Sequence, residues 1–236
     1  MLEFAATALV GGFDIAFGVA AYGLTAAAVE PRGGAGLAHL AGAITFGVAF
    51  VFIVVGRSEL FTENFLVPIT GLSRAGRSFL KLGELWLVSL VFNIVGGFAL
   101  TIVLTSEGVL RHGAKHSILH LAKHVADFSP STAFLSAIVA GALMTVMTWF
   151  VEGAAESLGV RILMAWLVGS LLVLGSFNHA VVGVIALFYA IRFGADVGWD
   201  ELFANLGISI VGNLVGGLAL VTFARSAQVF ASSSSR

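Results

Sequence analysis

The stretch Gly56–Ile69 reads GRSELFTENFLVPI and places an arginine, two glutamates and an asparagine directly after the apolar run AITFGVAFVFIVV. The chain around it is strongly apolar: of 236 residues, 58% are hydrophobic and 11% are charged, and the mean hydropathy is +1.02. A soluble domain carries about 25% charged residues. The sequence therefore predicts an all-α integral membrane protein with a polar interruption inside an apolar segment.

Charge and cysteine content exclude several functional classes. The formal net charge of -1 argues against a nucleic-acid partner. The chain has no cysteine, which excludes disulfides, thiolate metal sites and cysteine nucleophiles. The N-terminal MLEFAATALV lacks a basic region and a cleavage site, so we interpret it as the start of a spanning helix rather than a signal peptide. We expect one transmembrane domain over 1–230, a disordered tail over 231–236, and no cofactor.

Apolar length predicts the number of membrane crossings, since a helical crossing needs about 20 apolar residues. Six spans emerge, near 4–29, 37–69, 82–106, 131–151, 161–192 and 202–224. The second and fifth are too long and too polar at their centres, so we expect both helices to be broken, by GRSELFTEN and by GSFNHA respectively. Arg74, Arg77 and Lys81 favour a cytoplasmic loop between spans two and three, which places both termini in the cytoplasm as well.

The segment 107–130 is the long connection of the chain, and its pattern predicts an extramembrane amphipathic helix. Apolar residues at helical spacing are typical of a helix lying on the outer membrane surface: Ala114, Ile118, Leu121, Val125 and Phe128. Another face carries histidines at intervals of four: His112, His116, His120 and His124. These histidines form either a metal site or a hydrated polar face. No carboxylate sits at a matching spacing, so we favour the hydrated face and expect no metal.

An internal repeat divides the chain into two halves. VFNIVGGFAL begins at Val91 and VGNLVGGLAL begins 120 positions later at Val211, with seven of ten residues identical. The same offset places Glu59 opposite His179. The halves, about 4–106 and 131–224, each contain three spans, and an odd number makes the repeat inverted. Such proteins place their site where two broken helices meet near the membrane centre, so the sequence predicts a transport pathway.

Asn93 and Asn213 sit one helical turn before the Gly-Gly pairs of the repeat. Small residues let membrane helices approach closely, and amide side chains bond across them. We therefore predict structural support from both asparagines, whose carboxamides would bond the backbone groups freed by the two breaks.

ELFTEN at 59–64 and FNHAV at 177–181, in two broken helices of a six-span inverted repeat with Asn-x-x-Gly in spans three and six, resemble the formate/nitrite transporter family. The resemblance covers nearly the whole chain. It implies an aquaporin-like protomer in a homopentamer within the cell inner (plasma) membrane. It further implies that each protomer carries its own pore for small monovalent anions such as formate, nitrite or hydrosulfide.

The resemblance also implies roles for particular residues. Thr62 and His179 would be the threonine and histidine that meet in the pore, and Leu60 and Phe61 would belong to the inner apolar constriction. Leu172, two turns before the histidine, is our candidate for the outer constriction.

The chain departs from the family pattern at several positions, which marks it as a divergent branch. Asn178 stands where many members have a glutamate before the histidine, and Gly183 stands where they have an asparagine. The fourth span lacks the lysine that draws anions into the vestibule and ends in Glu152 instead. The carried ion therefore does not follow from the resemblance.

Histidine chemistry supplies a mechanism for passage. An isolated anion in hydrocarbon is very unfavourable, by tens of kcal/mol on a Born estimate. Imidazole exchanges a proton near neutral pH, so His179 can relay a proton to the anion of a weak acid, which then passes Leu60 and Phe61 as the neutral acid. Thr62 would orient the substrate, and helix N-termini would add positive potential. The alternative role of His179 is a hydrogen-bonded histidine that holds the loop.

The charged residues of the first break, Arg57, Glu59 and Glu63, have two interpretations. They form either a relay or ion site at the inner mouth, or a compensated cluster that braces the broken helix, with Glu84 as a further member. We favour bracing. Asp14 has the same ambiguity, with Arg57 or a freed backbone amide as its expected partner.

Three other functions remain open at this point. A pore for water or small neutral solutes shares the architecture, although the chain has no Asn-Pro-Ala motif. A carrier coupled to protons or cations would use the acidic cluster. Gly56 and Ser58 with His179 loosely resemble an intramembrane serine protease, but Glu59 replaces the second glycine of Gly-x-Ser-Gly. We therefore expect a transporter or channel rather than an enzyme.

Overall fold

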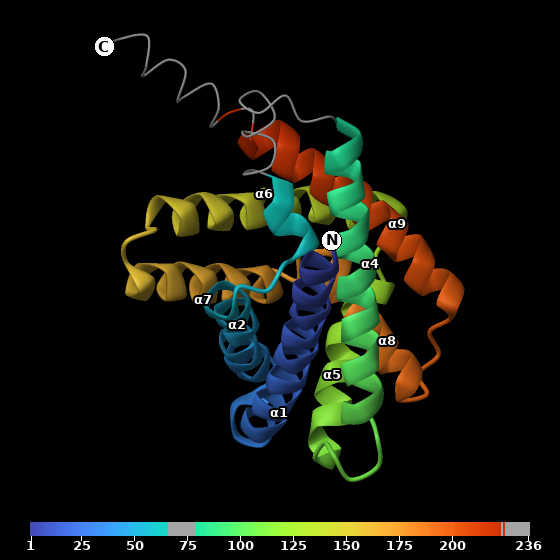
Figure 1. Ribbon diagram of the computed structural model, residues 1–236. Helices are drawn as coiled ribbons and strands as arrows, with labels where there is room; N and C mark the ends of the chain where they lie inside the picture. Colours follow the sequence, from blue (N-terminus) through green and yellow to red (C-terminus); the bar gives the residue numbers. More distant parts are fainter. Residues whose placement is uncertain (66–78, 223, 225–236) are drawn as a thin grey trace.

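The computed structural model describes residues 1–65, 79–222 and 224, and every regular element in this part of the chain is a helix (Figure 1). The elements are α1 (Leu2–Phe46), α2 (Val48–Gly56), η1 (Phe61–Phe65), α4 (Phe79–Leu104), α5 (His112–Ala126), α6 (Pro130–Gly153), α7 (Leu158–Leu174), α8 (Ala180–Arg192), α9 (Trp199–Leu214) and η2 (Val215–Thr222). Arg74, Arg77 and the predicted tail 231–236 lie outside the described residues.

Four stretches of the described chain are long and apolar enough to cross a bilayer: Leu2–Gly56, Leu80–Leu104, Pro130–Gly153 and Trp199–Ala219. Leu158–Leu174 and Ala180–Arg192 are shorter apolar helices. The fifth predicted span, 161–192, thus corresponds to α7 and α8 with non-helical residues between them. The complete six-span inverted arrangement stays a prediction.

The first two predicted spans are joined inside α1. A straight helix of the 55 residues from Leu2 to Gly56 would measure about 80 Å, far more than the hydrocarbon core of about 30 Å. The helix is interrupted at Gly34, whose φ of 71° and ψ of 175° are non-helical. The Tyr22 hydroxyl and Nδ1 of His39 are hydrogen-bonded at 2.9 Å, and Gly18 lies against Phe46. These contacts show that the two parts of α1 run antiparallel.

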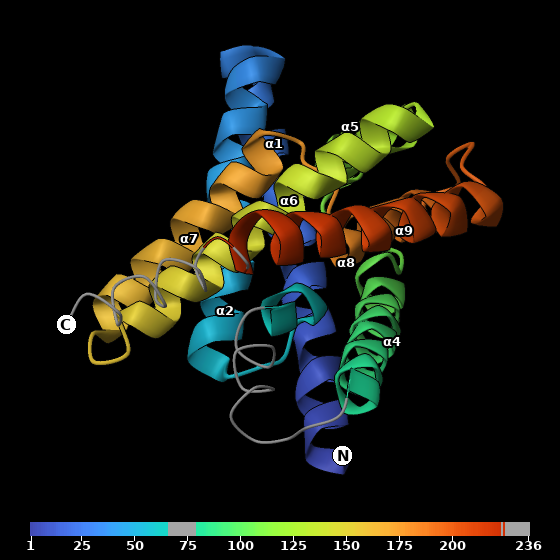
Figure 2. The same ribbon diagram turned by 90° about the horizontal axis from the view of Figure 1, so that it is seen from above.

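Glycines bring the helices of each half into close backbone contact. Gly96 of α4 lies against the Leu9 carbonyl of α1, and Gly216 of η2 lies against the Ile138 carbonyl of α6. A Cβ atom at either glycine would collide with that carbonyl. The two Gly-Gly pairs of the repeat therefore make equivalent contacts, and α4 lies along α1 as α9 and η2 lie along α6 (Figures 1 and 2).

The α8 helix is enclosed by protein, with every residue from Ala180 to Ala190 buried. A helix that is apolar on all sides is typical of a protein interior. The Tyr189 hydroxyl donates to the Ala16 carbonyl at 3.0 Å, and the rings of Phe98 and Phe188 are stacked. With 13 residues, α8 is too short to cross a bilayer alone, so its first turn begins inside the molecule.

The connection 107–130 contains a helix, α5, but its apolar face packs on the protein. Ala114, Ile118, Leu121 and Val125 are buried, and Phe128 is half-buried. Ile118 lies beside Gly23 of α1. This face is therefore occupied by protein rather than open to lipid headgroups. The position of α5 relative to the bilayer stays a prediction.

The histidines of α5 point away from this packed face. His112, His116, His120 and His124 are exposed. Nδ1 of His116 lies 3.8 Å from the Glu30 carboxylate, a neighbour on α1 that spacing within the segment did not reveal. Among the described residues, no group of three or more metal-ligating side chains comes together.

Candidate functional site

The first interruption lies between α2 and η1. Arg57 follows α2 in the left-handed conformation, with φ 55° and ψ 36°, and the Ser58 N–H donates to the Ile53 carbonyl at 3.1 Å. Leu60, Phe61 and Thr62 come next, and each has at most 2% of its surface exposed. The stretch that looked too polar for a spanning helix therefore turns these three side chains into the protein.

The second interruption lies between α7 and α8. Ser176 has a positive φ of 49°, and the Phe177 N–H donates to the Leu172 carbonyl at 3.0 Å. His179 immediately precedes α8 and caps it, because its Nδ1 accepts a hydrogen bond from the Val182 N–H at 3.2 Å. Helix N-termini carry positive potential, so the start of α8 favours negative charge nearby.

The two interruptions meet at Thr62 and His179. Thr62 Oγ1 lies 2.8 Å from His179 Nε2, and both side chains are fully buried. Since Nδ1 accepts from Val182, the neutral ring carries its hydrogen on Nε2 and donates to Thr62 Oγ1. The Thr62 hydroxyl is then left with its own hydrogen as a donor. The pair therefore offers a donor that is well suited to an anion.

Asn93 supports the first break with three hydrogen bonds to backbone. Its Oδ1 accepts from the Phe61 N–H at 2.9 Å, and its Nδ2 donates to the carbonyls of Ala8 at 2.7 Å and Glu59 at 2.8 Å. The carboxamide thus pairs the Phe61 N–H and the Glu59 carbonyl at the break, and its bond to Ala8 ties the break to α1.

Asn213 supports the second break in the same way. Its Oδ1 accepts from the Ala180 N–H at 2.9 Å, and its Nδ2 donates to the carbonyls of Ala137 at 2.8 Å and Asn178 at 3.1 Å. This pattern equates Leu60, rather than Glu59, with His179. The offset of 120 residues holds for the two asparagines but is wrong by one position at the breaks. Phe61 and Ala180, whose N–H groups the asparagines bind, are 180 − 61 = 119 residues apart.

The other predicted pore residues lie in the surrounding core. Leu60, Phe61 and Leu172 belong to one buried hydrophobic cluster, and Phe61 packs edge-to-face on Phe65 at 5.0 Å between ring centroids. Leu172 is 1% exposed in the last turn of α7. Their roles as constrictions stay predictions.

Asn178 is buried, but its side chain turns toward α6 rather than the imidazole. Its N–H donates to Ser136 Oγ at 3.0 Å, and its Nδ2 donates to the Ala133 carbonyl at 3.3 Å. Within the described chain, its Oδ1 has no hydrogen-bond partner, and neither has Oδ1 of Asn205 on α9. Both oxygens face Gly183, at 3.1 Å and 3.5 Å from the point that a Cβ atom would occupy. Asn205 was missed at the sequence level, although it is an isolated amide in an apolar span.

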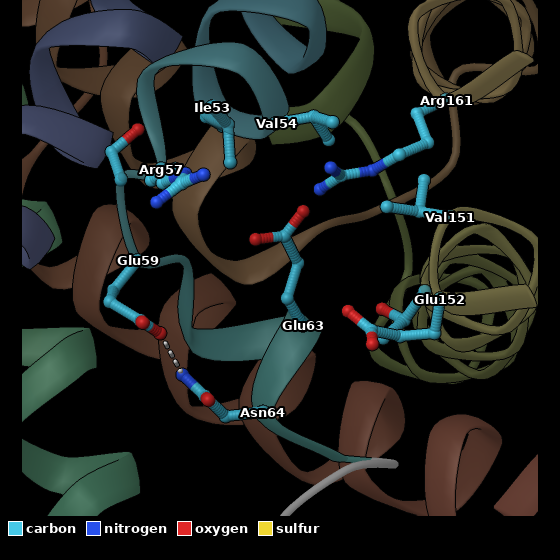
Figure 3. A pocket seen from close by; sticks show the side chains of 11 residues that line it. Ile53, Val54, Arg57, Glu59, Glu63, Asn64, Val151, Glu152 and Arg161 are labelled. Atoms are coloured by element: carbon cyan, nitrogen blue, oxygen red, sulfur yellow. Dashed lines mark hydrogen bonds between the residues drawn. The ribbon is translucent and has the colours of Figure 1, made fainter. Parts of the chain in front are cut away.

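The charged residues of the first break line a cavity of about 270 Å³ together with two residues that the sequence did not associate with them (Figure 3). Glu152 ends α6 and Arg161 lies near the start of α7. In the described residues, no direct ion pair joins these groups, and Glu59 accepts instead from Asn64 Nδ2 at 3.2 Å. The expected compensated cluster is therefore wrong in its contacts. Glu84 is exposed and is not among the residues lining the cavity.

Asp14 has a partner that the sequence did not predict. Its carboxylate accepts a hydrogen bond from the Ser58 hydroxyl at 2.5 Å. The expected partners, Arg57 or a backbone amide, were wrong because Arg57 points its side chain into the cavity (Figure 3). Ser58 is therefore bound to a structural carboxylate on α1.

Comparison with known proteins identifies the family to which the chain belongs. The family model described as formate/nitrite transporter matches residues 1–227. The chain belongs to the formate/nitrite transporter family. Among its relatives, Inner membrane protein YfdC of Escherichia coli (strain K12) is 26% identical over 94% of this chain and 71% of that protein. Formate-nitrite transporter 3 of Toxoplasma gondii is 28% identical over 75% of this chain and 36% of that protein.

Solved structures of formate/nitrite transporter relatives share the fold. A pentameric formate channel with formate bound matches with a TM-score of 0.77 and 18% identity, covering 97% of each chain. An ion channel described as an FNT family member matches with a TM-score of 0.83 and 16% identity, over 96% of this chain and 90% of that one. The family and its structural neighbours are transporters and channels, and together with the apolar helices they support a membrane location.

Gly183 is the position where this member of the formate/nitrite transporter family lacks the expected asparagine, and Gly183→Asn should stabilise the protein. The new amide would donate to the unpaired oxygens of Asn178 and Asn205, and α8 would lose an internal glycine. We expect a gain of about 1 kcal/mol, seen as a higher melting temperature in detergent. Gly183→Ala supplies the helix effect without a donor. If Gly183→Asn and Gly183→Ala have the same melting temperature, the new amide forms no stabilising hydrogen bond with the two oxygens.

Proposed function

We propose that the protein moves small monovalent anions of weak acids, such as formate, nitrite or hydrosulfide, through a pathway at Thr62 and His179. We further propose that it does so as a homopentamer in the cell inner membrane, with one pathway in each protomer. The observation that carries the proposal is the fully buried 2.8 Å contact between Thr62 and His179. Family membership and a pentameric structural neighbour with formate bound support it.

The hydrogen-bond directions at the pair suggest how an anion would be received. His179 donates through Nε2, so Thr62 presents its own O–H to the pathway. The first turn of α8 adds positive potential. A dry apolar passage beside Leu60 and Phe61 disfavours the charged form, so a weak acid would pass there after taking up a proton.

A proton relay through His179 requires a change at Nδ1. The neutral ring has one hydrogen, and giving it away without replacement would leave an imidazolate. Protonation of Nδ1 needs that atom to release the Val182 N–H, which it binds at 3.2 Å. The relay we propose therefore alternates between a ring that caps α8 and an imidazolium that has left the cap. When the imidazolium passes its Nε2 proton through Thr62 to the anion, the neutral ring keeps its hydrogen on Nδ1. The capping ring is restored when Nε2 takes up a proton and Nδ1 releases its own, so that Nδ1 can again accept from the Val182 N–H.

His179→Asn tests the relay. Asparagine keeps a polar side chain that can cap α8 and bond Thr62, but it cannot exchange a proton. Formate uptake into liposomes by the wild type should rise as the pH falls, because a larger fraction of the imidazole is then protonated. The variant should keep a reduced uptake that no longer follows that titration. An unchanged pH profile in His179→Asn would remove the relay and leave His179 as a loop-holding residue.

A carrier coupled to cations or protons is the second candidate, because the cavity beside the pathway is lined by Glu59, Glu63 and Glu152. The same liposomes should be given a panel of anions, cations and neutral solutes. Anion flux without cation flux supports the main proposal. Swelling with neutral solutes or cation uptake without anion flux would replace it.

A further inference from the structure

The charged cavity next to the pathway is not used by the mechanism above. It opens between the end of α2, η1, α6 and the start of α7 (Figure 3). Its volume of about 270 Å³ exceeds that of several water molecules, each of which takes about 30 Å³ in the liquid. Within the described part of the chain, five ionisable side chains line it: Arg57, Glu59, Glu63, Glu152 and Arg161. Glu63 directly follows Thr62, so the cavity adjoins the Thr62–His179 pair.

Arg161 has no ion-pair partner among the described residues. Its side chain is half-buried, and its Nε is buried with no hydrogen-bond partner in the part of the chain that the structure describes. A buried N–H donor of a charged group that has no acceptor is unfavourable. The guanidinium reaches across the cavity toward the Glu63 carboxylate (Figure 3). This arrangement indicates that a ligand completes the hydrogen bonding of Arg161.

Arg57 supplies a second guanidinium from the opposite wall. Its left-handed backbone is unfavourable for a residue with a side chain. The turn is held by the bond from the Ser58 N–H to the Ile53 carbonyl, and Ser58 is in turn bonded to Asp14. This backbone conformation directs the Arg57 side chain into the cavity (Figure 3).

Glu63 occupies the space between the two guanidinium groups in the view of Figure 3. It forms no direct ion pair with either arginine within the described residues. A carboxylate that lies between two cations occupies the position at which a free anion of similar size would bind. Glu59 is held by Asn64, and Glu152 is exposed, so neither is placed between the guanidinium groups.

We propose that this cavity is an anion-binding site in which Arg57 and Arg161 hold a small monovalent carboxylate or similar anion, and that Glu63 competes with this anion until Glu63 accepts a proton. Arginine suits the role because its planar fork of N–H donors matches a carboxylate. The identity of the anion rests on the proposed function, whereas the competition rests on the cavity itself.

Charge balance makes binding depend on a proton. Among the residues that the structure describes, the lining holds three carboxylates and two guanidinium groups, an excess of one negative charge. Asp14, the acidic group facing this turn from α1, is engaged with Ser58. Protonation of Glu63 makes this described lining neutral and removes the negative charge that lies between the two guanidinium groups in Figure 3, so anion binding strengthens as the pH falls. The anion and the proton would then enter the pathway together.

Arginine modification tests the site without requiring transport. The full-length protein in lipid nanodiscs is treated with phenylglyoxal, and the rate at each arginine is measured by peptide mass spectrometry with formate, with formamide, or with neither. Formate should slow modification of Arg57 and Arg161 several-fold, more strongly near pH 6 than near pH 8. Formamide, its uncharged counterpart, should not protect. The exposed Arg32 and Arg111 are internal controls.

Glu63→Gln tests the competition, and Glu152→Gln is the matched control. Removing the Glu63 charge should lower the formate concentration for half-protection about tenfold and abolish its pH dependence. Glu152→Gln should retain the pH dependence. Equal modification rates with and without formate, in the wild type and in Glu63→Gln, would overturn the site. Protection that is independent of pH in the wild type would overturn the competition.

Parallel flux measurements separate this inference from the proposed function. Formate uptake without protection of the arginines would refute the cavity site and leave the function intact. Protection without flux of any anion would refute the function and leave the site intact.

Discussion

Replacing Thr62 with valine should reduce formate uptake roughly tenfold to a hundredfold. Valine has nearly the shape of threonine, so the buried packing around Leu60 and Phe61 is retained. The change removes the hydroxyl that accepts from His179 Nε2 and that would donate to the anion. A hydrogen bond to a charged group contributes about 1.5–3 kcal/mol, and 1.4 kcal/mol is a factor of ten.

Thr62→Ser is the matched control, because it keeps the hydroxyl and loses only a methyl group. We expect it to retain most of the uptake, and we expect both variants to melt within a few degrees of the wild type. Initial rates of labelled formate uptake at one pH provide the measurement. Equal rates for the valine variant and the wild type would show that the hydroxyl does not contact the transported species.

Replacing Asn213 with alanine should destabilise the protein by about 3–5 kcal/mol, the largest stability effect we expect. The change removes the acceptor of the Ala180 N–H and the side-chain donor to the Asn178 carbonyl, together with a bond to the Ala137 carbonyl inside α6. Asn93→Ala removes the equivalent three bonds at the first break and should have a similar effect. Each variant would also loosen the turn that carries one member of the Thr62–His179 pair.

Asn205→Ala is the control for this prediction, since it removes another buried amide of α9 whose Oδ1 has no partner among the described residues. Its cost should be clearly smaller. Thermal unfolding in detergent, followed by formate uptake of the surviving protein, gives both readouts. If Asn213→Ala and Asn205→Ala melt at the same temperature, the bonds to the break do not carry the stability that we assign to them.

Several features of the site were predictable from the sequence because they follow from local patterns. The repeat around Gly96 and Gly216 marked close helix contacts, since only small residues allow backbones to approach. ELFTEN and FNHAV, in their order and separation, pointed to Thr62 and His179, and the structure brings these residues into contact. The predicted alignment of the two halves was wrong by one residue at the breaks. The equivalent positions there are set by the hydrogen bonds of Asn93 and Asn213, which a count of residues along the chain does not reveal.

Apolar length and internal repetition can be measured along the chain, so the sequence predicts an apolar helical membrane protein with two polar interruptions. Which polar groups meet follows from the packing of the helices in space. Asp14 meets Ser58, and Glu63 faces Arg161 across a cavity, although each pair is far apart in sequence. Such contacts depend on how helices pack, because the packing sets which polar side chains lie close enough to a buried charge to bind it. For this reason the sequence did not predict the charged cavity, in which Nε of Arg161 has no hydrogen-bond partner among the described residues.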